Sequence, residues 1–141
     1  MKKLFFFFFL VFLFSCKKPD DSLVIKAGFA CGWGAGEDSL EISNLEIKYV
    51  YYVPVESAQP KINESRAITK SEWDEIEDAI NINKFRKLDY NTCNICVDGC
   101  DEWISMQGDD INHQIRFSKG QQIEDISKLQ EIIWRIKAEF H

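Results

Sequence analysis

The stretch SLEISNLEIKYVYYV, residues 39–53, decides the fold of this chain. Apolar and polar residues alternate on both sides of positions 43–44, which is the pattern of two half-buried strands joined by a tight turn. A two-residue turn there would set four apolar side chains on one face in two cross-strand pairs, Ile42 with Leu45 and Leu40 with Ile47. The sequence therefore predicts a β-hairpin with one buried face.

A second hairpin is predicted from EWISMQ and INHQIRF, joined through Gly108-Asp109. Glycine at the first turn position suits a type II′ turn. The expected register pairs Met106 with Ile111 and Ile104 with His113. His113 then falls on the apolar face, so we interpret it as a hydrogen-bonded core or edge histidine and not as a metal ligand.

The remaining segments complete an α+β pattern. Residues 23–29 read as a strand, a Gly-rich loop follows, and residues 54–68 read as a polar connection. Thr69 and Glu72 have capping-box spacing at the start of a helix, and a longer amphipathic helix begins at Ile123. We therefore expect a single α+β domain over 23–141, with a mainly antiparallel sheet of about five strands and both helices on one face.

The N-terminus predicts export. Lys2 and Lys3 precede an unbroken apolar run from Leu4 to Phe14, too short for a helix to cross a bilayer core of about 30 Å but typical of a signal peptide. LFSC, which ends at Cys16, resembles the lipobox of bacterial lipoproteins. The resemblance implies cleavage after residue 15, diacylglycerol on Cys16 and acyl chains that anchor the protein to a membrane. The alternative is a plain secretory signal with an incidental cysteine.

The segment KKPDDS, residues 17–22, reads as a polar tether. It also resembles the Lys-then-acidic export signal of surface lipoproteins in Bacteroidota. The stretches GFACGWG and NTCNICVDGCD resemble small uncharacterised lipoproteins of the same bacteria, which implies no particular activity. The expected location is the outer membrane of the bacterial cell envelope, on either its periplasmic side or its cell-surface side.

Charge excludes one class of partner. Without residues 1–15, the chain keeps 15 basic residues against 23 acidic ones, a balance of −8. Such an acidic domain lacks the electrostatic basis for binding DNA or RNA. The sequence also shows no phosphate loop and no nucleophile motif. These patterns favour a non-enzymatic domain that binds a protein or surface ligand, and the aromatic candidates for that contact are Trp33 and Tyr52, with Trp103 better explained by packing.

Four cysteines remain beside Cys16, and an even number in a small exported domain favours disulfides. Of the three connectivities, we prefer Cys93–Cys100 with Cys31–Cys96, because this pairing ties the loop to itself and to the first strand. The alternatives are a zinc site made by Cys31, Cys93, Cys96 and Cys100, or a thiol-disulfide oxidoreductase that uses the Cys93-x-x-Cys96 motif. Acidic neighbours speak against the second alternative, since they raise a thiol pKa. No other cofactor is expected.

Overall fold

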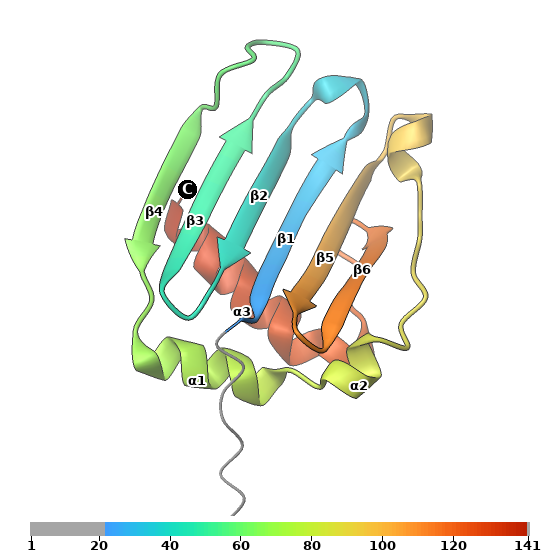
Figure 1. Ribbon diagram of the computed structural model, residues 1–141. Coiled ribbons are helices and arrows are strands. Elements are labelled where there is room, and N and C mark those ends of the chain that lie inside the picture. The colour runs from blue at the N-terminus through green and yellow to red at the C-terminus, as the bar shows by residue number, and fades with distance from the viewer. Residues whose placement is uncertain (1–21, 141) are drawn as a thin grey trace, which may run out of the picture.

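The computed structural model describes residues 22–140 and shows one antiparallel sheet in the order β4-β3-β2-β1-β5-β6 (Figure 1). The α+β class with an antiparallel sheet is confirmed, but the sheet has six strands, not about five. The strands are β1 (Val24–Cys31), β2 (Glu37–Ile42), β3 (Glu46–Tyr52), β4 (Ile62–Ala67), β5 (Cys100–Gly108) and β6 (Ile111–Ser118).

Three α-helices accompany the sheet: α1 (Lys70–Ala79), α2 (Ile82–Phe85) and α3 (Ser127–Lys137). Helix α3 crosses one face of the sheet, whereas α1 and α2 lie along its lower end (Figure 1). The two predicted helices are therefore present and bury side chains in the same core on one side of the sheet, but only α3 lies across the face, and α2 was not predicted. No helix within residues 22–140 is long and apolar enough to cross a membrane.

The helix starts and stripes follow the sequence pattern. Thr69 accepts a hydrogen bond from the Glu72 N–H, and the Glu72 carboxylate accepts one from the Thr69 N–H, so the predicted capping box is confirmed. The apolar side chains of α3 and of the turns that flank it are buried against the face of the sheet that α3 covers. These side chains are Ile123, Ile126, Leu129, Ile132, Ile133 and Ile136.

Both hairpins form, but each register differs from the prediction by two residues. Ile42 pairs with Ile47 and not with Leu45, because the Ser43 hydroxyl accepts N–H bonds from Leu45 and Glu46 and closes a longer turn. In the second hairpin Met106 pairs with His113, and Ile104 pairs with Ile115. A register shift of two residues keeps every side chain on the same face of the sheet. The apolar residues predicted for the buried face of the hairpins are therefore buried, except Leu45, which lies exposed in the turn.

The sixth strand, β4, lies within the segment predicted to be a polar connection. Its sequence, INESRA, has no run of alternating apolar residues. It forms because its backbone pairs along β3, from Ile62 opposite Tyr51 to Ala67 opposite Glu46. Arg66 then joins this edge strand to the helices through Glu72 and Glu139, at 2.8 and 2.7 Å.

Candidate functional site

Three loops meet at the end of the sheet opposite the start of β1 (Figure 1). We name them together the tip, and they are residues 32–36, 53–61 and 93–99. Each loop exposes one large apolar side chain: Trp33 is 81% exposed, Val55 67% and Val97 77%. Within residues 22–140 the only other large apolar side chain with comparable exposure is Leu45, at the opposite end of the sheet. The tip therefore concentrates apolar surface in an acidic domain.

Trp33 is held outward by an unusual backbone conformation. Its φ is 57° and its ψ is 15°, inside a short 3-10 turn of residues Gly32–Gly34. The left-handed region costs a bulky side chain about 1–2 kcal/mol. Burial of the indole does not offset this cost, because the side chain is directed to solvent. Such a strained and exposed aromatic residue is typical of a contact site.

The three loops are connected by backbone contacts. The Gly32 N–H donates to the Gly99 carbonyl at 2.9 Å, and the Val55 N–H donates to the Gly34 carbonyl at 3.3 Å. A Cβ at Gly32 would lie 2.9 Å from the Asp98 Cα, so only glycine lets the first and third loops approach this closely. The loop that carries Trp33 is therefore held between the other two.

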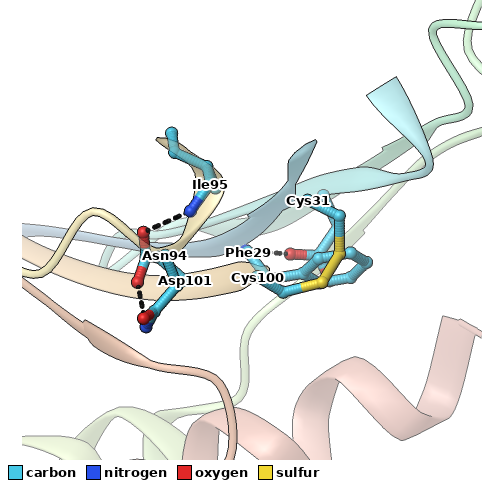
Figure 2. Close-up of a disulfide and its surroundings, with 7 residues drawn as sticks. Phe29, Cys31, Asn94, Ile95, Cys100 and Asp101 are labelled. Atoms are coloured by element: carbon cyan, nitrogen blue, oxygen red, sulfur yellow. Dashed lines mark hydrogen bonds between the residues drawn. A yellow bond between two sulfur atoms is a disulfide. The ribbon is translucent and has the colours of Figure 1, made fainter. Parts of the chain in front are cut away.

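A disulfide between Cys31 and Cys100 fixes the base of the tip. The two residues face each other at the ends of β1 and β5, with a Cα–Cα distance of 4.1 Å. The Cys31 N–H donates to Gly36 on the other side of β1, so the cysteines occupy a non-hydrogen-bonded pair, where strands bring Cα atoms closest. Phe29 lies beside this disulfide on the same face of β1 (Figure 2).

The second disulfide joins Cys93 to Cys96 across the 3-10 turn Asn94–Val97. The expectation of two disulfides agrees with the structure, but the preferred pairing of Cys93 with Cys100 and Cys31 with Cys96 was wrong. The physical reason is that β1 and β5 are neighbours, which places Cys31 against Cys100 and leaves the other two cysteines to each other. Cysteines that are joined in two disulfides have no free thiolates, so they do not supply the four ligands of the alternative zinc site.

Asp101 anchors the loop 93–99 from the other face of β5 (Figure 2). Its carboxylate accepts hydrogen bonds from the Thr92 hydroxyl at 2.7 Å, the Asn94 amide at 2.8 Å and the Ile95 N–H at 3.2 Å. Burial alone would raise the Asp101 pKa, but these donors outweigh it and hold the pKa below its ordinary value. The charged form of Asp101 is thus part of the folded loop.

A buried ion pair lies below the tip, on the face of the sheet toward α3. Lys137 Nζ is 2.7 Å from Asp38 Oδ1, and both side chains are largely removed from solvent. The Phe29 N–H and the Tyr49 hydroxyl also donate to Asp38. Nearby, burial raises the pKa of Glu102 above its ordinary value. The pair joins the end of α3 to the sheet, and sequence reasoning missed it because the partners lie 99 positions apart.

The other predicted contact residues differ in exposure. Tyr52 is half-buried in β3, so the structure leaves it less accessible than Trp33. Trp103 packs over Gly28, where an added Cβ would lie 2.7 Å from the ring, which agrees with its interpretation as a packing residue. Val55 and Val97 were not predicted, because each follows other apolar residues closely along the chain, Val53 and Ile95, and no local pattern marks it as exposed.

His113 behaves as predicted. Its Nε2 lies 2.9 Å from the Leu88 carbonyl oxygen, and its ring meets Phe85 edge-on. Within the described part of the chain, no group of three or more His, Cys, Asp or Glu side chains could hold a metal ion. Cys16, the signal segment 1–15 and residues 16–21 of the tether lie outside the described residues.

Comparison with known proteins matches this chain to no family model and to no curated protein.

Proposed function

We propose that this protein is a lipid-anchored binding module of the bacterial cell envelope, and that it acts without catalysis by holding a protein or surface ligand at the tip. The observation that carries the proposal is the exposure of Trp33, Val55 and Val97 on three connected loops. Connected loops lose little conformational entropy when a partner binds, so their exposed side chains are suited to recognition.

The position of the tip fits attachment at Cys16. The described chain begins at Ser22, whose hydroxyl accepts a hydrogen bond from the Asp109 N–H at the lower end of the sheet. From there β1 runs eight residues toward the tip, a distance of about 26 Å at the usual rise per residue. The start of β1 and the tip lie at opposite ends of the sheet (Figure 1). Lipid on Cys16 would therefore hold the lower end near the membrane and direct the tip away from it.

The anchoring half of the proposal is tested by intact-mass spectrometry of protein extracted from membranes. We expect a mature chain that begins at Cys16 and carries diacylglycerol and further acyl mass. Cys16→Ser should remove the lipid mass and release the protein from the membrane fraction. An unmodified chain that begins at Met1 and stays soluble inside the cell would reject the proposal.

The binding half is tested by site-specific photocrosslinking in intact cells. A photoreactive amino acid at position 33 should give a discrete crosslinked product, whereas the same group at Leu45 should not. Leu45 is the matched control, because its side chain is 76% exposed but lies in the turn at the far end of the sheet. Equal crosslinking from both positions, or none from position 33, would argue against the tip as the contact surface.

A further inference from the structure

The Cys93–Cys96 disulfide is accessible in a way that the Cys31–Cys100 disulfide is not. Cys93 and Cys96 are both exposed, whereas Cys31 and Cys100 are half-buried at the ends of paired strands. A thiolate must reach a sulfur atom before it can exchange with a disulfide. An external thiol therefore meets the Cys93–Cys96 bond first.

This disulfide stabilises the folded chain less than the other one does. It joins residues three positions apart, whereas Cys31 and Cys100 are 69 positions apart. In the chain-entropy description, a crosslink that closes so short a loop restricts the unfolded chain much less than one that closes a long loop. A structural role alone therefore gives a weak reason for Cys93 and Cys96 to be joined.

The loop that carries the pair is held in place by other contacts. Asp101 binds Thr92, Asn94 and Ile95, which flank or lie between the two cysteines. The Gly99 N–H closes the end of the turn by donating to the Asn94 carbonyl at 2.8 Å. None of these bonds uses a sulfur atom, so the loop has the means to keep its shape when the disulfide opens.

We propose that Cys93 and Cys96 form a redox-active pair that exchanges with thiols, while Cys31–Cys100 remains closed as a structural bond. A thiolate attacks one of the two sulfurs, the Cys93–Cys96 bond breaks, and the other sulfur leaves as a thiolate that takes a proton from water. A second thiol then attacks the mixed disulfide. In total, two external thiols are oxidised to one disulfide, and Cys93 and Cys96 are reduced to thiols. The attacking thiolate is external in this direction, so the acidic neighbours that disfavour Cys93 as a nucleophile slow the exchange but do not prevent it. This activity goes beyond binding at the tip and does not depend on it.

The test uses the folded domain in glutathione buffers of graded redox ratio, without denaturant. After quenching with an alkylating reagent, peptide masses report which cysteines were reduced. We expect Cys93 and Cys96 to become labelled together, Cys31 and Cys100 to stay joined, and the circular dichroism to stay unchanged. Return to an oxidising buffer should restore the bond. Opening of both disulfides together, opening only in denaturant, or loss of the fold on opening would overturn the proposal.

Single variants test the exchange step itself. Cys96→Ala leaves Cys93 without its partner, so oxidised glutathione should form a stable mixed disulfide that mass spectrometry detects as one adduct. Cys93→Ala should trap the adduct on Cys96 in the same way. The double variant Cys93→Ala/Cys96→Ala, which keeps Cys31–Cys100, is the matched control and should form none. Absence of an adduct on both single variants would overturn the proposal, as would an equal adduct on the double variant.

Discussion

Replacing Cys31 and Cys100 together by alanine tests how far one covalent bond holds the sheet together. The bond has a sequence separation of 69, so it closes most of the domain into a loop. For a loop of about 70 residues, the chain-entropy expression gives about 4.4 kcal/mol of stabilisation at 25 °C. Opening the short loop of the other disulfide removes about 1.9 kcal/mol by the same expression. The free energy of unfolding should therefore fall more than twice as much in Cys31→Ala/Cys100→Ala as in Cys93→Ala/Cys96→Ala.

The measurement is urea unfolding followed by circular dichroism, with Cys93→Ala/Cys96→Ala as the matched control. At a typical m-value of about 1.5 kcal/mol per molar urea, the Cys31→Ala/Cys100→Ala variant should lose about 3 M in its midpoint and the control about 1 M. Alanine fits both positions without leaving a polar group in the sheet. If the control lost as much stability as the long-range pair, loop length would not explain what these bonds do, and the reasoning would be refuted.

Three further substitutions test the polar contacts. Asp101→Ala removes the acceptor of three hydrogen bonds and should cost about 2–3 kcal/mol in urea unfolding, with faster amide exchange in the loop 93–99; an unchanged loop would contradict its role as an anchor. The Arg66 guanidinium holds the Glu72 pKa at about 2, below its ordinary value, so this contact should stabilise the fold above about pH 4.5, and its stabilisation should be lost toward pH 2. Glu72→Gln should therefore make the free energy of unfolding depend less on pH on the acid side. An unchanged slope would contradict the role of the Arg66–Glu72 contact. Lys137→Met should cost about 3 kcal/mol in thermal or urea unfolding, because it leaves the Asp38 charge buried without its cation, and adding Asp38→Asn should recover part of the loss.

The sequence predicted side-chain faces better than strand registers, and the two hairpins show why. Alternation states which face a side chain occupies, and a shift of two residues leaves every face unchanged. The register depends instead on the turn. At residues 43–46 the Ser43 side chain selected a longer turn than the two-residue one, which left Leu45 exposed.

The features that the sequence did not predict depend on neighbours that are distant along the chain. β4 carries little apolar pattern and forms because β3 offers it an edge. The partner of Cys31 follows from the position of β5 next to β1, which no local pattern encodes. Trp33 could be named as a contact candidate because an aromatic residue in a Gly-rich loop is visible locally, but its two neighbours at the tip became visible only when the loops were brought together.

The course of β1 has a mechanical consequence for a protein held at one end and loaded at the other. A pull between Val24 and Trp33 acts along a single strand that is already extended, so the force is carried by covalent bonds with almost no lengthening. A pull on Val97 reaches the same strand through Gly99, Cys100 and the sulfur bridge to Cys31. Tension between an anchor and a load on Trp33 or Val97 would therefore bypass the helices and the outer strands, which stay folded without resisting it.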